Sequence, residues 1–172
     1  MKEQVILVDE KDQEIGLMEK MEAHQKGLLH RAFSVFLFNS QGDLLLQKRA
    51  SSKYHSPSLW TNTCCSHPRK NESILDAASR RLQEEMGIQA ELQKKFSFIY
   101  KAELDQGLTE HELDHVITGI FNEDPIINLD EVEDWKYISI TELNLDIKLK
   151  PENYTEWFKI CLNETLSLSS KS

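Results

Sequence analysis

The sequence predicts an α/β (α+β) protein in which a mixed β-sheet is flanked by helices. Apolar segments with strand-like patterns alternate along the chain with segments of helical periodicity. The 172 residues suit one hydrophobic core of ordinary size, and no internal repeat or linker-like stretch divides them. We therefore expect a single domain over residues 1–172.

The N-terminal part of the chain is expected to form a hairpin followed by a short helix. Residues 5–8 and 15–18 are two apolar runs separated by a charged, turn-forming stretch, which is typical of paired strands. A helix over residues 19–26 follows. Gly27 ends this helix, because glycine adopts the left-handed conformation at low cost.

Two consecutive strands are expected next, at residues 30–39 and 44–48. The first is strongly apolar along its whole length, which is typical of a strand that is buried on both faces. A turn containing glycine joins the two strands. Arg49 and Lys53 follow the second strand, where they can form either an ordinary basic loop or a clamp for phosphate groups.

Residues 60–73 are predicted to form a polar, turn-rich loop. This loop carries the adjacent thiols of Cys64 and Cys65, followed by Ser66, His67 and a proline.

A helix is predicted over residues 74–86. Its apolar positions recur every four residues and form one stripe, made of Ile74, Ala78, Leu82 and Met86. Asn71 or Ser73 can cap the start of the helix, and Gly87 can end it. Arg81 and Glu85 lie one turn apart on this helix, so both can face the same site.

The next segments are expected to form a hairpin of long strands. Aromatic residues alternate along residues 96–100. Within residues 108–121, one face carries Glu110, Glu112 and Asp114, and the other carries His111, Leu113 and His115. If the hairpin is centred on Gln106, Tyr100 lies opposite Glu112.

The C-terminal part is expected to contain one more strand and two helices. The strand covers residues 131–138, and Ser139 can cap a helix over residues 140–145. After a break, a last helix is expected over residues 152–166. Pro151 suits the first turn of that helix, because proline has no N–H to leave unsatisfied.

Composition excludes several classes of function. The net charge of -9 disfavours nucleic acid as a partner, and it means that an anionic ligand needs a local basic pocket, a metal ion or both. No apolar run is long enough to cross a bilayer, and the charged N-terminus is unlike a signal peptide. The 3 cysteines are a poor disulfide framework. We therefore expect a cytoplasmic protein.

Histidines and glutamates from separate segments form a candidate metal site. Its members are His24, His30, His67, Glu110 and Glu112. Two glutamates at positions i and i+2 of a strand lie roughly 7 Å apart at their backbones, which is close enough for one cation. Three imidazoles with two carboxylates suit Mn, Zn or Fe better than Mg or Ca. A single histidine is more often structural, so spacing alone leaves both interpretations open.

From Ser66 onward the spacing resembles the Nudix box. The pattern of that motif is Gly-x5-Glu-x7-Arg-Glu-U-x-Glu-Glu-x-Gly-U, where x is any residue and U is an aliphatic residue. The positions that agree are Glu72, Arg80, Leu82, Glu84, Glu85, Gly87 and Ile88. Ser66 replaces the glycine, and Arg81 replaces the first glutamate of the Arg-Glu pair. In Nudix hydrolases that glutamate cluster holds the divalent ions that activate water on a pyrophosphate. A cation at this position suits binding a diphosphate more than cleaving one.

Residues 61–68 resemble the Thr-Asn-x-x-Cys-x-His-Pro segment of type 1 isopentenyl diphosphate isomerases, which share the Nudix fold. Matching segments at residues 22–24, 28–33 and 109–112 extend the resemblance over nearly the whole chain. It implies a Nudix-type mixed β-sheet flanked by helices, with an N-terminal hairpin and a C-terminal helix that covers the site.

The resemblance also implies roles for individual residues. The three histidines and two glutamates named above would hold one divalent metal ion. Glu85 would hold a magnesium ion that is bound with the substrate. The positions at which the family binds diphosphate are Lys20, Arg49, Lys53 and Arg81. Trp157 matches the aromatic residue that faces the reacting carbons.

The implied reaction interconverts isopentenyl and dimethylallyl diphosphate through a tertiary carbocation. It needs an acid on one face of the substrate and a base on the other. Glu112, near Tyr100, is expected to supply the proton. Cys65 is expected to remove one as a thiolate, with its pKa lowered by a nearby cation. Trp157 can stabilise the carbocation by a cation–π interaction of roughly 2 kcal/mol or more in a dry site.

Two other functions remain open, which are a Nudix hydrolase of a nucleoside diphosphate derivative and a non-catalytic module that binds metal or diphosphate. Ser66 and Arg81 disfavour the hydrolase, and Cys65 with Glu112 and Tyr100 disfavours the binding module. We expect an enzyme that acts on a small isoprenoid diphosphate as a monomer or weak dimer, without nucleic acid or membrane partners. Residues without a counterpart in the family's site, and expected to serve packing or to face solvent, are His55, His111, His115, Cys64 and Cys161.

Overall fold

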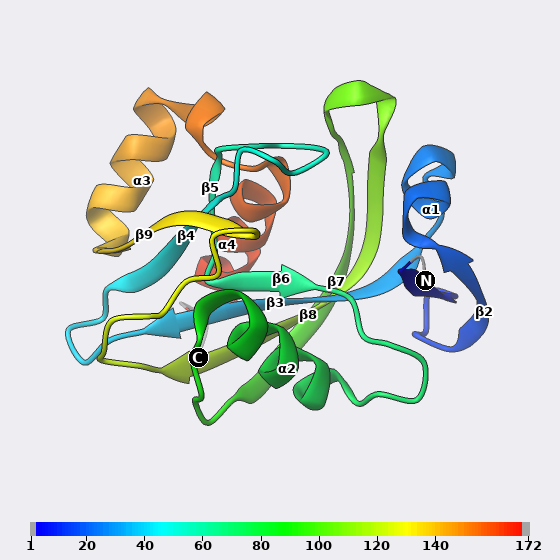
Figure 1. Ribbon diagram of the computed structural model, residues 1–172, viewed down its shortest axis with the longest axis horizontal. Helices are drawn as coiled ribbons and strands as arrows, with labels where there is room; N and C mark the ends of the chain where they lie inside the picture. The colour runs from blue at the N-terminus through cyan, green and yellow to red at the C-terminus, as the bar shows by residue number, and fades with distance from the viewer. Residues whose placement is uncertain (1–2, 170–172) are drawn as a thin grey trace.

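A nine-stranded mixed sheet lies at the centre of the computed structural model, which describes residues 3–169 (Figure 1). The strands are β1 (Gln4–Val8), β2 (Glu14–Glu19), β3 (His30–Phe38), β4 (Leu44–Arg49), β5 (Trp60–Thr61), β6 (Cys64–Ser66), β7 (Gln93–Glu103), β8 (Thr109–Ile120) and β9 (Val132–Ile138). The helices are α1 (Lys20–Lys26), α2 (Ile74–Met86), α3 (Ile140–Leu149) and α4 (Glu156–Ser169), with 3₁₀ turns η1 (Asp105–Gly107) and η2 (Pro151–Asn153). This architecture confirms the predicted fold class, including the N-terminal hairpin of β1 and β2.

Strand β3 is the central strand of the sheet. It pairs in parallel with β8 along its whole length, from His30 opposite Glu112 to Phe38 opposite Ile120. It also pairs antiparallel with β6, and at its ends with β1 and β4. Because strands and helices cover it on all sides, an apolar sequence is the stable one here. The register of this pairing places His30 beside Glu112.

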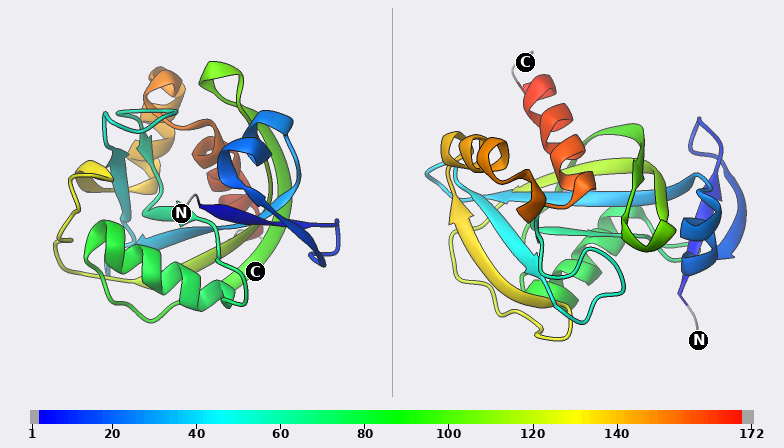
Figure 2. Two further views of the ribbon diagram at one scale, coloured as in Figure 1. Left: turned by 45° about the vertical axis from the view of Figure 1, so that its right-hand side comes forward. Right: turned by 90° about the horizontal axis from the view of Figure 1, so that it is seen from above.

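Helices cover both faces of the sheet, with α2 on one face and α3 with α4 on the other (Figure 2). Side chains along β3 alternate between these two layers. Phe33 and Val35 pack with α2, whereas Phe36 packs in the core that contains α4. Helix α1 lies beside the β7–β8 hairpin at one end of the sheet (Figure 1). Helix α1 and the β7–β8 hairpin, which are distant in sequence, therefore lie next to each other at one end of the sheet.

Helix α2 begins and ends at residues that the sequence pattern predicts. Of the two candidate caps, it is Ser73 whose hydroxyl accepts a hydrogen bond from the backbone N–H of Asp76, at 3.2 Å. Asn71 lies in the preceding loop with a φ of 67°. Gly87 ends the helix with a φ of 62°, in the left-handed region. The apolar stripe packs against the sheet, and Glu85 lies buried at the edge of that stripe.

The segment that was expected to be a loop around the two thiols is partly a strand. Cys64–Ser66 forms β6, which pairs antiparallel with β3. The side-chain amide of Asn62 donates hydrogen bonds to the carbonyls of Val35 and Cys64, and so fixes the entry into the strand. Alternation along β6 turns Cys64 into the core under α2 and Cys65 to the other side.

The two C-terminal helices differ from their predicted bounds. Helix α3 continues to Leu149, past its expected end at residue 145 and into the break expected at residues 148–150. Pro151 starts the separate 3₁₀ turn η2, and α4 begins only at Glu156. The Thr155 hydroxyl accepts a hydrogen bond from the backbone N–H of Phe158, which explains the later start. Within residues 3–169, the structure has no helix of the length and apolar character needed to cross a membrane.

Candidate active site

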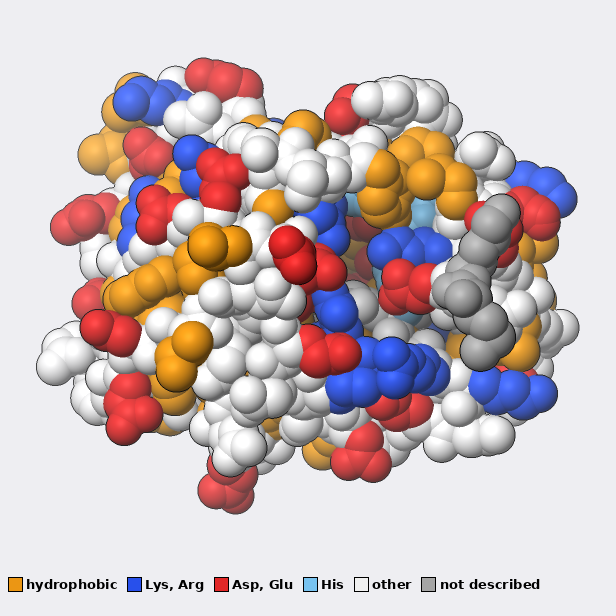
Figure 3. All heavy atoms as spheres, viewed as in Figure 1, with side chains coloured by type: hydrophobic (Ala, Val, Ile, Leu, Met, Phe, Trp, Pro, Cys, Tyr) orange, Lys and Arg blue, Asp and Glu red, His pale blue; other side chains and the backbone are white. Residues whose placement is uncertain are grey.

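A polar cavity of about 120 Å³ opens between α2, the β7–β8 hairpin and α4. Basic side chains gather around this hollow, and histidine side chains are visible inside it (Figure 3). Its lining residues are Glu3, Lys20, His24, Gln47, Arg49, Lys53, Tyr54, His55, Cys65, Ser66, His67, Arg81, Glu85, Glu110, Glu112, Glu131 and Trp157. All of the site residues predicted from sequence line it except His30 and Tyr100, which are buried directly behind the glutamates. The fold therefore brings the predicted residues together.

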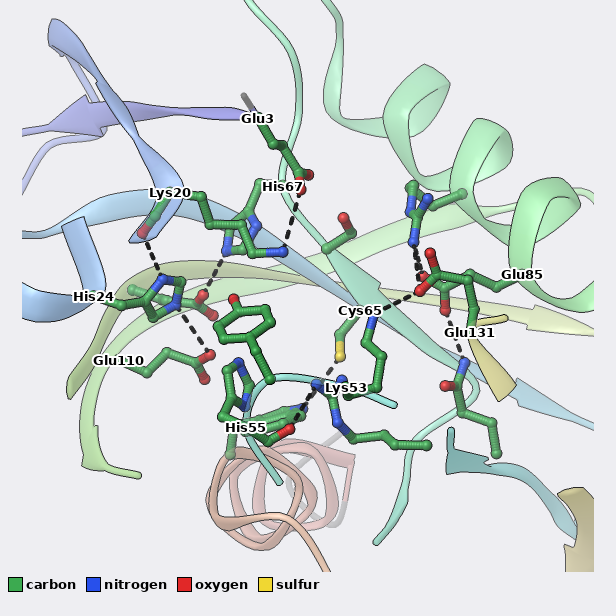
Figure 4. Close-up of a pocket in the computed structure, with 17 residues that line it drawn as sticks. Glu3, Lys20, His24, Lys53, His55, Cys65, His67, Glu85, Glu110 and Glu131 are labelled. Carbon is green, nitrogen blue, oxygen red and sulfur yellow. Dashed lines mark hydrogen bonds and ion pairs between the residues drawn. The ribbon is translucent and has the colours of Figure 1, made fainter. Parts of the chain in front are cut away.

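Four of the five predicted metal ligands have ligand atoms within 4.8 Å of one another. They are His24, His30, His67 and Glu112, and all four are buried. The Nε2 atoms of His30 and His67 lie 3.2 and 2.8 Å from Oε2 of Glu112. Glu110 lies beside this group, with Oε2 at 3.7 Å from Nε2 of His24 (Figure 4). This buried group of histidines and glutamates can hold a metal ion.

The hydrogen bonds of the imidazole rings fit metal binding. Nδ1 of His24 donates to the carbonyl of Lys20 at 2.8 Å, and Nδ1 of His30 donates to the carbonyl of Leu28 at 2.9 Å. These bonds fix both rings with Nε2 directed into the cluster, as is usual for histidine ligands. Nε2 of His24 is buried without a hydrogen-bond partner among residues 3–169. A divalent cation would satisfy that nitrogen.

Tyr100 connects the two glutamates. The register of the β7–β8 hairpin places it opposite Glu112, as predicted. Its hydroxyl donates to Oε1 of Glu112 at 2.6 Å and is also hydrogen-bonded to Glu110. Burial and the nearby charges of both carboxylates raise the pKa of Tyr100 well above its ordinary value. The phenol therefore stays protonated and acts as a hydrogen-bond donor.

The two carboxylates differ in their affinity for a proton. Burial and then the negative charge of Glu112 raise the pKa of Glu110. Burial also acts to raise the pKa of Glu112, but hydrogen bonds from His30 and His67 outweigh it, and the pKa lies well below its ordinary value. Opposed shifts of this kind, in two neighbouring carboxyl groups, are typical of acid–base sites.

Cys65 lines the same cavity, next to Trp157 of α4. The indole N–H of Trp157 donates to its sulfur at 3.2 Å. Burial raises the pKa of Cys65; Arg49 acts in the lowering direction, and nearby glutamates, with Glu85 the first of them, add to the rise. The sequence predicts a lowered pKa for Cys65. That prediction is wrong for the polypeptide without a metal ion, because desolvation raises the pKa more than the charge of Arg49 lowers it.

Three of the cavity's basic residues are paired with acidic groups. Lys20 lies 3.2 Å from Glu3, and Lys53 lies 2.5 Å from Glu131. Arg81 forms an ion pair with Glu85, at 2.5 Å. These pairs balance the local charge inside a protein that is strongly acidic overall. Sequence reasoning missed Glu3 and Glu131, because neither stands in a motif.

Arg49 is held by backbone groups. Its Nε and Nη2 donate at 3.2 Å to the carbonyls of Ser56 and His55. Its guanidinium lies 5.0 Å from the centre of the Trp157 ring. This places a fixed positive charge between the loop after β4 and helix α4.

His55 was expected to serve packing or to face solvent, but it lies in the cavity. Its ring centre is 5.9 Å from that of His24 and 5.6 Å from that of Trp157. Burial and then the charge of Arg49 lower its pKa to about 2, so the ring is neutral. A histidine in an irregular loop gives no periodic signal, so the sequence alone did not single it out. His115 instead pairs with Asp12 at 3.0 Å, away from the cavity.

Comparison with known proteins agrees with this site. The NUDIX domain model matches residues 28–158. Over 170 residues, the chain is 53% identical to "Isopentenyl-diphosphate Delta-isomerase 2" of Aromatoleum aromaticum, which covers 99% of this chain and 90% of the relative. It is also 53% identical to a Photorhabdus laumondii protein of the same name, over 95% of this chain and 92% of the relative.

Solved structures show the same fold at much lower identity. DR0079 from Deinococcus radiodurans superposes with a TM-score of 0.71 at 19% identity, covering 86% of this chain and 90% of that one. The MutT protein from Methanosarcina mazei Go1 gives 0.64 at 16% identity, covering 84% and 96%. At such identities the likeness concerns the fold alone. With the family model and the relatives at 53% identity, the chain belongs to the isopentenyl-diphosphate Delta-isomerase family of NUDIX-domain proteins.

Proposed function

We propose that this enzyme interconverts isopentenyl diphosphate and dimethylallyl diphosphate. The observation that carries the proposal is that Cys65, Glu110 and Glu112 line one cavity, with Tyr100 hydrogen-bonded to both glutamates behind its wall. The reaction adds a proton to the terminal alkene carbon and removes a proton from the carbon on the other side of the resulting cation. An acid and a base that line one cavity can meet this need.

Glu112 is the proposed acid. The proton that it transfers is supplied within the hydrogen-bonded set of Tyr100, Glu110 and Glu112, where Glu110 holds a proton more strongly than an ordinary glutamate. The alkene accepts this proton at its terminal carbon, and the positive charge develops on the neighbouring tertiary carbon. The carboxylate left behind is stabilised by the hydrogen bond that it accepts from the Tyr100 hydroxyl.

Cys65 is the proposed base, and Trp157 the residue that stabilises the cation. The thiolate form of Cys65 takes the proton from the carbon next to the cationic centre, which forms the internal double bond. The Trp157 N–H supports negative charge on the sulfur. Its ring is 3% exposed and helps to exclude the water that would otherwise trap the cation.

The diphosphate is proposed to bind at the basic end of the cavity. The residues proposed to contact it are Lys20, Arg49, Lys53 and Arg81. Glu85 is proposed to hold a magnesium ion that is bound with the substrate. Oε1 of Glu85 is fixed by Gln47, whose side-chain Nε2 donates a hydrogen bond to it at 2.9 Å. The Lys53–Glu131 ion pair must open or reorganise when an anion enters.

The divalent ion is proposed to be Mn, Zn or Fe, held by His24, His30, His67, Glu110 and Glu112. When bound, it supplies positive charge that draws electrons from the carboxylates and makes a proton on them more acidic. All of these groups come from one chain, so we propose that the enzyme acts as a monomer or weak dimer. We place it in the cytoplasm.

Incubation of the metal-loaded enzyme with isopentenyl diphosphate, followed by proton NMR, tests this function. The signals of the terminal alkene should give way to those of the dimethylallyl group without release of phosphate. Phosphate release would instead indicate a hydrolase that acts on diphosphates. Absence of both products, with retained binding, would indicate a binding module.

A further inference from the structure

We propose that His55 is a further ligand of the ion held by the histidine–glutamate cluster, so that six protein side chains face one cation. This proposal rests on the metal site of the proposed function, to which it adds a residue. His55 is buried, and it comes from the loop between β4 and β5, which contributes no other proposed ligand.

The backbone around His55 is fixed from two other parts of the fold. The N–H of Ser56 donates to the side chain of Asp105, in the turn of the β7–β8 hairpin, at 3.0 Å. The carbonyl of His55 accepts from Arg49 at 3.2 Å. The hairpin that carries Glu110 and Glu112 therefore also positions the loop that carries His55.

The ring of His55 is held in one orientation by aromatic neighbours. Tyr54 contacts it edge-on with ring centres 4.4 Å apart, and Trp157 contacts it edge-on at 5.6 Å. These contacts lie around the ring and leave it directed toward His24 and Glu110 (Figure 4). A ring fixed in this way loses little conformational freedom when it binds an ion.

The distances fit donors around an ion better than hydrogen-bonded partners. Ligand atoms of His24, His55 and Glu110 lie within 4.8 Å of one another. Among these atoms, Nε2 of His24 and Oε2 of Glu110 are 3.7 Å apart, which is too long for a hydrogen bond. Atoms that each lie about 2.0–2.2 Å from a common ion are separated by distances of about 3 to 4.4 Å.

The two groups of donors share His24, and this makes them one site. Nδ1 of His24 is used by the carbonyl of Lys20, so only Nε2 faces the cavity. One nitrogen lone pair binds one cation. The group of His24, His55 and Glu110 and the group of His24, His30, His67 and Glu112 therefore converge on a single ion. Four imidazoles and two carboxylates suit a six-coordinate borderline cation.

The test compares His55→Phe with His111→Phe in titrations with Co²⁺, without substrate. Phenylalanine keeps the ring contacts to Tyr54 and Trp157 but has no donor atom. His111 is a matched control, since its ring bonds to the carbonyl of Gly27 outside the cavity. Circular dichroism checks that both variants fold.

The proposal predicts that wild type and His111→Phe bind one Co²⁺ with equal affinity. His55→Phe should bind one Co²⁺ at least about tenfold more weakly, since even an outer hydrogen-bond partner of a ligand is worth that much. Its visible absorption should also intensify, because cobalt absorbs more strongly when fewer than six ligands surround it. Rescue of wild-type affinity by His55→Gln, which restores a donor atom, would support ligation further.

Several results would overturn the proposal. Equal affinity and equal spectra for His55→Phe and His111→Phe would show that His55 is not a ligand. Two ions bound to wild type and one to His55→Phe would show two sites in place of one. A wild-type protein that binds no divalent ion at all would instead refute the metal site of the proposed function.

Discussion

At the scale of single residues, the cavity separates groups that hold protons from groups that release them. Glu110 and Tyr100 have raised pKa values and Glu112 has a lowered one, although all three are in contact. The difference arises from partners: His30 and His67 both bond to Glu112. Chemically similar side chains on one strand therefore differ in their affinity for a proton.

Replacing Cys65 tests the base. Cys65→Ala should lower kcat by about a hundredfold or more, because a positioned base contributes that much. The fold and the metal content should stay unchanged, because Cys65 is neither part of the core under α2 nor one of the proposed metal ligands. The comparison is Cys64→Ala, which should retain turnover and cost about 1 kcal/mol of stability, because Cys64 is buried in the core. Equal loss of activity in both folded variants would contradict the assignment.

Arg81→Glu restores the first glutamate of the hydrolase pattern. We expect it to raise KM by about ten- to a hundredfold, because a charged hydrogen bond is worth about 1.5–3 kcal/mol and the new carboxylate would repel the diphosphate. It should also repel Glu85, the present partner of Arg81. Isomerase kinetics measured together with phosphate release are the appropriate assay.

The neighbouring Arg80→Glu provides a matched charge reversal. Arg80 pairs with Glu72 and Glu84 and does not line the cavity. Its variant should change stability more than KM. An unchanged KM in Arg81→Glu would show that Arg81 does not contact the diphosphate, and efficient phosphate release would favour a hydrolase site.

At the scale of elements, periodic segments were predictable from sequence and short irregular ones were not. The apolar stripe and caps of α2 and the register of the β7–β8 hairpin depend on local pattern, and both were predicted correctly. Strand β6 depends on pairing with β3, and the start of α4 depends on contacts to Trp60 and Thr61, which no local pattern encodes. The place of His55 in the cavity was not predicted either, because it depends on contacts between segments that are distant in sequence. The motif residues were found because their segments resemble a known family.

The end of α2 can be tested with a glycine pair. Gly87 has a φ of 62°, and an added Cβ would lie 2.6 Å from the carbonyl oxygen of Ile126. Gly42 has a φ of 82° with nothing within 4 Å of an added Cβ. Both alanine variants pay roughly 1–2 kcal/mol for the left-handed conformation. Gly87→Ala should cost about 1–3 kcal/mol more, because backbone must move.

Urea unfolding of Gly87→Ala and Gly42→Ala measures this difference directly. Backbone N–H groups of Ile126 and Asn128 donate to the carbonyls of Met86 and Glu85 at the end of α2. A shift there should therefore also weaken substrate binding at Glu85 and Arg81. Equal stability of the two variants would mean that the loop at residues 126–128 yields without cost.

At the scale of the whole molecule, the buried histidines make the metal-free protein sensitive to acid. Burial is the main cause that lowers the pKa of His67 to about 4 and that of His55 to about 2. The unfolded chain takes up protons near pH 6.5, but these rings in the folded protein do not. Their stabilising contribution is complete above pH 6.5 and falls as the pH drops toward 4.

The raised pKa of His30 acts in the opposite direction, but only above pH 6.5, because below that pH its ring is protonated in both the folded and the unfolded chain. With EDTA present, His67 and His55 should each lower the free energy of unfolding by up to about 1.4 kcal/mol per pH unit between pH 6.5 and pH 4. Urea unfolding at a series of pH values measures it, and His67→Gln should flatten the slope. A constant stability between pH 7 and pH 5 in the wild type would contradict this account.

The parallel pairing of β3 with β8 determines when, during synthesis on the ribosome, the site can assemble. His30 and Glu112 are 82 residues apart, so a nascent chain exposes His24, His30 and His67 well before Glu110 and Glu112 have been synthesised. Closing so long a loop costs more entropy than forming a local hairpin, which makes this pairing a late event. An ion that needs both strands can bind only after that event. It should therefore lengthen the lifetime of the finished protein by slowing unfolding, and hardly accelerate folding.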